Sequence, residues 1–175
     1  MKIDKYSTLL SPVDNEHFKR RFFLTGEPIN ESLITNVFFV PRAGDKWLYL
    51  VKDSGKLDYP GGELREGESV IFGLERMLGL ELGISMKSIN KLGHWILEDK
   101  YETPLREHFS HPISAAVVFT GDASFVNSNN LKSATTEEVC RLLKSENRHL
   151  QADIYLACAE YLESLDEFKT KGIHE

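Results

Sequence analysis

The segment Leu57–Ile84, LDYPGGELREGESVIFGLERMLGLELGI, constrains the fold more than any other part of the sequence. It places Pro60, Gly61 and Gly62 between a strand-like run and a helix-like run. We predict a loop over residues 59–67 and then a helix from residue 69 to about residue 82, ended by a glycine in the left-handed conformation. Gly61 and Gly62 could let backbone groups approach a ligand closely, although ordinary turn chemistry explains Pro-Gly-Gly equally well.

The spacing of the residues after Gly62 is more specific than the glycines themselves. Five residues separate Gly62 from Glu68, and seven separate Glu68 from Arg76. Four further positions then follow in a fixed order, and they are Leu78, Glu81, Gly83 and Ile84.

This pattern resembles the signature of the Nudix hydrolase family: Gly, five residues, Glu, seven residues, then Arg-Glu-apolar-any-Glu-Glu-any-Gly-apolar. The resemblance spans roughly residues 34 to 165. It implies an α+β fold class, a Nudix-like α/β/α sandwich with a mixed β-sheet between helices. It also implies an enzyme that hydrolyses nucleoside diphosphates linked to another moiety, with Mg²⁺ or Mn²⁺ held by glutamates of the helix.

Two of the three family glutamates are missing from this sequence. Positions i, i+3 and i+4 share one helix face, and in this register that face carries Met77, Leu80 and Glu81. The resemblance therefore leaves Glu81 as the catalytic and metal-binding carboxylate, with the backbone of Gly62 as a second metal ligand. It assigns to Gly61, Glu68 and Arg76 the bracing of the loop and the helix.

Two functions remain open from the sequence. The first is a Nudix-type, Mg²⁺-dependent hydrolase of a nucleoside diphosphate derivative with a reduced metal site. The GDP-mannose mannosyl hydrolases of the same family are similar, because they also have non-acidic residues at these two positions. The second is a catalytically inactive Nudix-fold protein that binds a nucleotide or a protein partner. Apolar replacements favour the second function, because clustered carboxylates repel one another unless a metal is bound.

The helix also gives an expectation about burial. Apolar residues occupy most of its circumference, which is typical of a helix that is buried all round. We therefore expect Met77 and Leu80 to be shielded from water by the chain's own termini or by a second subunit, which leaves a homodimer open.

A polar connection between two predicted strands, residues 89–98 and 112–120, supplies further candidates. Nudix enzymes take an additional metal ligand or a general base from this region, and a histidine that titrates near neutrality could deprotonate water. Solvated surface positions explain these residues at least as well. The weak candidates are Glu98, Glu102, Arg106, His108 and His111. The aromatic residues that could stack on a base are Trp47, Trp95 and Tyr101, although core packing explains Trp47 and Trp95 more simply.

The remaining segments give the order of elements and the domain organisation. Ser11 and Pro12 are typical of a helix start, so we predict a short helix within residues 11–24. Residues 1–30 are interpreted as an N-terminal extension and residues 31–175 as a Nudix-like domain that includes the C-terminal helices. Within that domain we predict strands at residues 33–40 and 46–52, and helices at residues 135–146 and 152–168.

Composition favours a small-molecule partner. The chain carries 27 acidic and 21 basic residues, and the net charge of −6 gives no general attraction to nucleic acid or to anionic lipid. No apolar run is long enough for a membrane span or typical of a signal peptide, so we expect a cytoplasmic protein. Cys140 and Cys158 are isolated, and we interpret both as packed thiols.

Overall fold

The computed structural model describes residues 3–24, 26–126 and 130–171, and its centre is a mixed β-sheet. The main strands lie side by side in the order β1-β2-β8-β9-β3-β4-β10, and only β3 and β9 pair in parallel among them. Their bounds are β1 Val13–Asp14, β2 Phe18–Phe23, β3 Ile34–Ala43, β4 Lys46–Val51, β8 Asn90–Asp99, β9 Ile113–Phe125 and β10 Leu131–Ala134. Three short strands join at its margins: β5 Leu57–Asp58, β6 Gly61–Glu63 and β7 Ile84–Met86.

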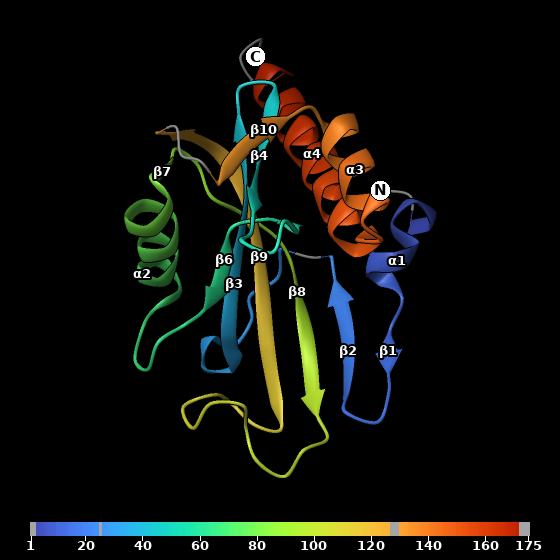
Figure 1. Cartoon of the computed structure of the whole chain (residues 1–175), viewed down its shortest axis with the longest axis vertical. Helices are drawn as coiled ribbons and strands as arrows, with labels where there is room; N and C mark the ends of the chain where they lie inside the picture. Colours follow the sequence, from blue (N-terminus) through green and yellow to red (C-terminus); the bar gives the residue numbers. More distant parts are fainter. Residues whose placement is uncertain (1–2, 25, 127–129, 172–175) are drawn as a thin grey trace.

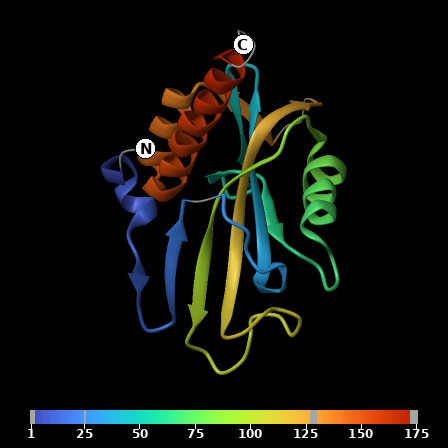
Figure 2. The same cartoon turned by 180° about the vertical axis from the view of Figure 1, so that it is seen from behind.

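Helices cover both faces of the sheet, as the sequence predicted. On one side lies α2 (Val70–Leu74), which continues as the π-helical η3 (Glu75–Leu80). On the other side lie α3 (Thr136–Ser145) and α4 (His149–Lys171), and the two opposite views show α2 apart from this pair (Figures 1 and 2). Short helical turns complete the chain: η1 Ile3–Tyr6, α1 Ser7–Leu10 and η2 Glu31–Leu33.

The alternation of side chains along β3 divides the core in two. Val37 and Phe39 are fully buried against the α2 side, in a cluster with Leu74 and Leu78. Residues of opposite parity, such as Val40, pack toward α4. Successive side chains of an extended strand point to opposite faces of the sheet. A strand that is covered on both faces therefore needs apolar residues at nearly every position. The predicted α/β/α sandwich is therefore confirmed.

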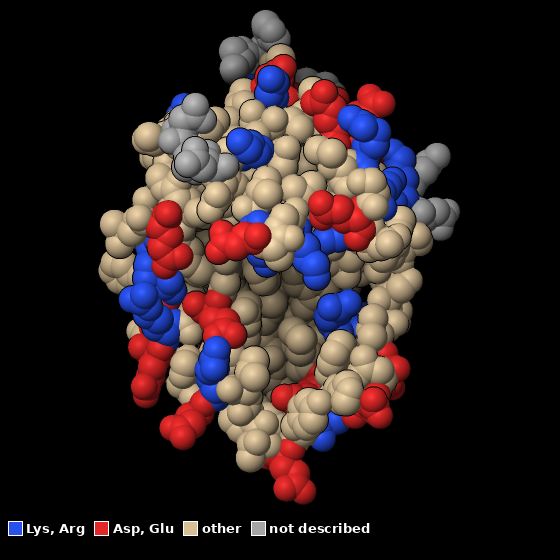
Figure 3. Space-filling view, viewed as in Figure 1, with Lys and Arg blue, Asp and Glu red and all other residues tan. Residues whose placement is uncertain are grey.

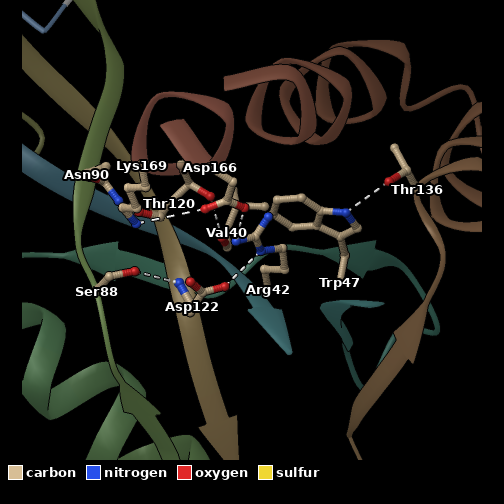
Figure 4. A network of polar contacts seen from close by, with 10 residues as sticks. All are labelled: Val40, Arg42, Trp47, Ser88, Asn90, Thr120, Asp122, Thr136, Asp166 and Lys169. Atoms are coloured by element: carbon tan, nitrogen blue, oxygen red, sulfur yellow. Dashed lines mark hydrogen bonds and ion pairs between the residues drawn. The ribbon is translucent and has the colours of Figure 1, made fainter. Parts of the chain in front are cut away.

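A polar network fixes α4 to the sheet (Figure 4). Arg42 on β3 donates from Nε to Asp122 on β9 at 2.7 Å and from Nη2 to Asp166 on α4 at 2.9 Å. Deeper in the same interface, the buried hydroxyl of Tyr155 donates to the carbonyl of Leu48 at 2.7 Å. Charged and neutral hydrogen bonds thus reinforce apolar packing between α4 and the central strands.

The short helix predicted within residues 11–24 is wrong. This segment forms an antiparallel hairpin of β1 and β2, and β2 pairs with β8 from Phe18 opposite Asp99 to Phe23 opposite His94. Helical turns occur earlier, at residues 3–10. Pairing with β8 overrides the helix-start signal, because Phe22 can then be buried while Arg21 and Phe23 point to the other face.

The loop predicted over residues 59–67 is also partly wrong, because both glycines lie in β6 and pair with β3. Gly61 has a φ of 143°, and a Cβ atom there would lie 2.4 Å from the carbonyl oxygen of Val37. Glycine is therefore required at this position by the close approach of two strands.

Among the described residues, no helix is both long and apolar enough to cross a membrane. Charges of both signs are interspersed over the face of the molecule shown in Figure 3.

Candidate functional site

The helix that carries the sequence motif begins and ends as predicted. Ser69 caps its first turn, accepting a hydrogen bond from the backbone of Phe72 at 3.3 Å. Gly83 ends it with a φ of 67°. Between them the backbone adopts π-helical pairing, in which residue i+5 bonds residue i, so the amide of Glu81 donates to the carbonyl of Arg76. The π-turn therefore places the side chains of Arg76 and Glu81 next to each other.

Arg76 is the centre of the polar contacts around this helix. Its Nε and Nη2 atoms each donate to Glu68 at 2.7 Å, its Nη1 donates to Glu81 at 3.0 Å, and Nη2 also donates to the carbonyl of Glu63 at 3.2 Å. Hydrogen bonds from Arg76, aided by the backbone amide of Arg65, lower the pKa of Glu68 to about 2. These contacts hold the loop that follows β6 against the start of the helix.

Met77 and Leu80 lie in opposite environments. Met77 is 4% exposed, and its sulfur lies 3.2 Å from the position that a Cβ on Gly62 would occupy. Met77 is buried as expected, although in the core cluster against the sheet and not under the chain's termini, and the shielding expected for Leu80 is wrong, because Leu80 is 86% exposed. Ile71 and Phe72 are exposed as well, so the helix is not buried all round. The reason is that α2 makes its main contacts outside its own helix with β3, so one side of the helix faces the sheet and the other side faces outward.

The residues present do not fit the divalent metal that the Nudix resemblance implies. The three family glutamate positions are 77, 80 and 81. Met77 is buried against Gly62, Leu80 is exposed, and only Glu81 has a carboxylate. The neighbouring carboxylates are already paired with arginines: Glu68 and Glu81 with Arg76, and Glu63 with Arg106. Nowhere in residues 3–24, 26–126 and 130–171 do three His, Cys, Asp or Glu side chains gather in a way that could hold a metal ion.

Two of the five weak candidates lie close to the motif helix, and both are in the connection between β8 and β9. Arg106 donates to Glu63 at 3.1 Å, and Nε2 of His108 lies 3.1 Å from the carbonyl oxygen of Leu64. A small polar cavity of about 130 Å³ lies between this connection and the loop. Arg106 and His108 are thus brought to the loop beside the motif helix.

The other three candidates lie apart from these contacts. Glu98 is on β8 beside Lys19, at 3.7 Å, and Glu102 lies on the exposed part of the connection. His111 approaches the carbonyl oxygen of Tyr101 at 2.9 Å. The structure therefore does not assemble the five candidates into one catalytic group.

A large cavity lies on the opposite face of the sheet, beneath the start of α4. Its volume is about 750 Å³. Its floor is formed by side chains of β2, β3, β8 and β9, and the connection between β8 and β9 closes one side. The aromatic residues that line it include Phe38, Tyr59, Trp95, Tyr101 and Phe109.

Sequence reasoning found only part of this cavity. Trp95 and Tyr101 were recognised as possible stacking residues, and both line it, whereas Trp47 packs in the core and donates to Thr136 at 2.9 Å. Tyr59 and Arg20 were not recognised as site residues. The alternation of Phe18, Arg20 and Phe22 could have indicated a strand face, but its pairing with β8 depends on contacts far apart in sequence.

Comparison with known proteins supports the fold. No protein-family model matches the sequence, and no curated protein matches it. The structure is similar to a pyrophosphohydrolase from Bacillus subtilis, with a TM-score of 0.58 and 15% identity over 84% of this chain and 92% of the other. It is also similar to a Nudix hydrolase from Nitrosomonas europaea, with a TM-score of 0.50 and 17% identity over 75% and 89% of the two chains. These likenesses, together with the strand order and the motif helix, show that the chain has the Nudix fold.

Proposed function

We propose that this chain binds a nucleotide derivative in the large cavity and does not hydrolyse it with a metal held by the motif helix. The observation that carries this proposal is the contrast between the two faces of the sheet. One face has a helix on which the three family glutamate positions carry Met77, Leu80 and Glu81, and Glu81 is paired with Arg76. The other has an open cavity of about 750 Å³ with aromatic walls.

The helix supports the loss of metal chemistry by its packing. Met77 fills the space beside Gly62, the residue whose backbone would act as a second metal ligand. Glu81 is hydrogen-bonded to Arg76, which also holds Glu68. A hard cation would have to compete with a guanidinium for the single remaining carboxylate, and Mg²⁺ normally binds through one or two carboxylates and substrate phosphates.

The cavity supports binding by its size and its walls. Sites for small organic ligands are typically clefts of roughly 300–1,000 Å³, lined by apolar and aromatic side chains with a few polar groups. Phe38 lies edge-on to both Tyr59 and Trp95, with ring centroids 5.4 and 6.3 Å apart, so three packed aromatic rings contribute to one wall of the cavity. A nucleobase suits such a wall, because aromatic rings pair both edge to face and in offset stacks.

The second candidate is the Mg²⁺-dependent hydrolase with a reduced site. It is favoured by the side chain of Glu81, which is 52% exposed on the helix surface, and by the pyrophosphohydrolase activity named for the Bacillus subtilis protein. That protein shares only 15% of its residues with this chain, so its activity is a suggestion for this one.

Calorimetric binding and turnover assays separate the two functions. We expect members of a panel of nucleoside mono- and diphosphates and nucleoside diphosphate sugars to bind wild type in EDTA, and none to be hydrolysed with Mg²⁺. Glu81→Gln should leave binding unchanged, as should the control Glu75→Gln on the exposed side of the same helix. Mg²⁺-dependent turnover that Glu81→Gln abolishes and Glu75→Gln preserves would establish the hydrolase instead.

A further inference from the structure

Tyr59 presents to the large cavity a hydroxyl group that no described residue binds. Tyr59 is only 6% exposed and lines the cavity, yet its hydroxyl makes no hydrogen bond to any described residue. Burial raises the pKa of Tyr59 above its usual value, so the group remains a protonated donor at neutral pH. The buried hydroxyl of Tyr155 nearby is satisfied by the carbonyl of Leu48.

A second donor without a partner comes from Trp95. This residue is 5% exposed, lines the same cavity and has no described hydrogen-bond partner for its indole N–H, whereas the indole N–H of Trp47 donates to Thr136. Among the described side chains, the only completely enclosed polar atom without a partner is Nδ1 of His94. The polar atoms of Tyr59 and Trp95 are therefore reached by solvent, and the cavity is the open space that both residues line.

Arg20 adds a positive charge at the β2 side of the cavity. It makes no ion pair with a described residue, and its guanidinium lies 5.8 Å from the ring centroid of Phe18. By contrast, Arg42, Arg76 and Arg148 are each paired with a carboxylate. Burial is the main cause of the raised pKa of Tyr59, and the charges of Arg148 and Arg20 both oppose that rise.

Arg20 also lines an adjoining cavity of about 490 Å³, so this residue lies where two cavities adjoin. The carboxylate in the lining of the large cavity, that of Asp99, is opposite Phe18 in the strand register and accepts a hydrogen bond from the backbone of Tyr101 at 2.9 Å. Arg20 is opposite Leu97, two residues further along β8. The β2 side thus offers an unpaired cation to a ligand.

We infer that the cavity recognises a flat ring that carries an anionic phosphate, and that Arg20 binds the phosphate without a metal. Tyr59 and Trp95 then donate to acceptor atoms of the ligand. In this orientation the phosphate points toward β2, whereas α2 lies beyond the opposite side of β3 (Figure 1). The inference rests on the proposed function, because it names the ligand class and its orientation in the same cavity.

The test compares nucleosides with their 5′-monophosphates by calorimetry in EDTA, for adenosine, guanosine, cytidine and uridine. In wild type we expect at least one monophosphate to bind about tenfold or more tightly than its nucleoside, as a charge-assisted contact predicts. Arg20→Gln should remove this difference. Arg21→Gln is the matched control, since Arg21 is the next residue on β2, faces the other way and lies over Phe23.

A donor variant tests the second part of the inference. Tyr59→Phe retains the ring, removes a hydroxyl that has no partner in the protein, and should weaken nucleotide binding about three- to tenfold without lowering the melting temperature. Equal affinity of wild type for nucleosides and monophosphates, or an equal loss in Arg20→Gln and Arg21→Gln, overturns the inference alone. Wild type that binds neither class of compound contradicts the proposed function and, with it, the inference.

Discussion

At the scale of single residues, Arg76 determines what the motif helix can do. A guanidinium has five donors in a fixed planar arrangement. Arg76 uses them in four hydrogen bonds, to the carboxylates of Glu68 and Glu81 and to the carbonyl of Glu63, which connect the helix to the loop after β6. The side chains of Arg76 and Glu68 are only 15% and 12% exposed, so solvent screens their ion pair weakly. Removing either partner of this ion pair would therefore leave the other charge largely buried and uncompensated.

We predict that Glu68→Gln destabilises the protein by about 2–4 kcal/mol at pH 7, because it removes one partner of a largely buried pair. The pKa of Glu68 is lowered from 4.5 to about 2, so its contribution to stability is complete above pH 4.5 and is lost as the pH falls toward 2. Urea unfolding of wild type and Glu68→Gln at several pH values should show the two curves converging under acid conditions. The exposed Glu75→Gln should differ from wild type by less than about 0.5 kcal/mol at any pH.

At the scale of elements, the sequence predicted the regular structure well wherever local pattern and long-range pairing agree. The central strands follow from β-branched and aromatic runs, and α3 follows from its apolar spacing. The structure adds a capping box at Thr135 that the sequence prediction does not use. The hairpin of β1 and β2 was missed because Pro12 favoured a helix locally, while pairing of β2 with β8 is a long-range contact that no local signal reports. The exposure of Leu80 was missed for a similar reason, since periodicity gives the apolar positions and not which of them a neighbour covers.

The motif helix provides a matched pair of substitutions. Met77→Ala should cost about 2–4 kcal/mol, because a buried side chain beside Gly62 leaves a cavity when it is truncated. Leu80→Ala, three residues later, should change stability by less than about 0.5 kcal/mol because its side chain is almost fully exposed. Chemical denaturation of both variants measures the difference. Comparable losses would mean that Leu80 is covered in solution, for example by a second subunit.

At the scale of the whole molecule, the N-terminal segment is part of the candidate site. Strand β2 supplies Phe18 and Arg20 to the cavity, and the preceding helical turns pack on α4, where the amide of Leu9 donates to Asp153 at 3.0 Å and Lys5 pairs with Glu160 at 2.7 Å. The sequence motif predicted the α2 side of the molecule, whereas the cavity side is assembled from segments distant in the chain, which is why Arg20 and Tyr59 could not be recognised from sequence.

This arrangement predicts that the N-terminal segment opens as a local unit and takes the ligand site with it. Leu9 is 1% exposed in the interface with α4, so Leu9→Ala should cost about 2–5 kcal/mol in that interface. Because β1 and β2 are joined to the rest of the sheet only through β8, their amides should exchange faster in Leu9→Ala, while those of β3 and β9 keep their protection. Nucleotide affinity should fall in parallel, since opening displaces Arg20. Hydrogen exchange with mass spectrometry, with Leu80→Ala as the exposed control outside the cavity, measures both regions at once. Uniform acceleration across β3 and β9 would show instead that the N-terminal segment and the central sheet unfold as one unit.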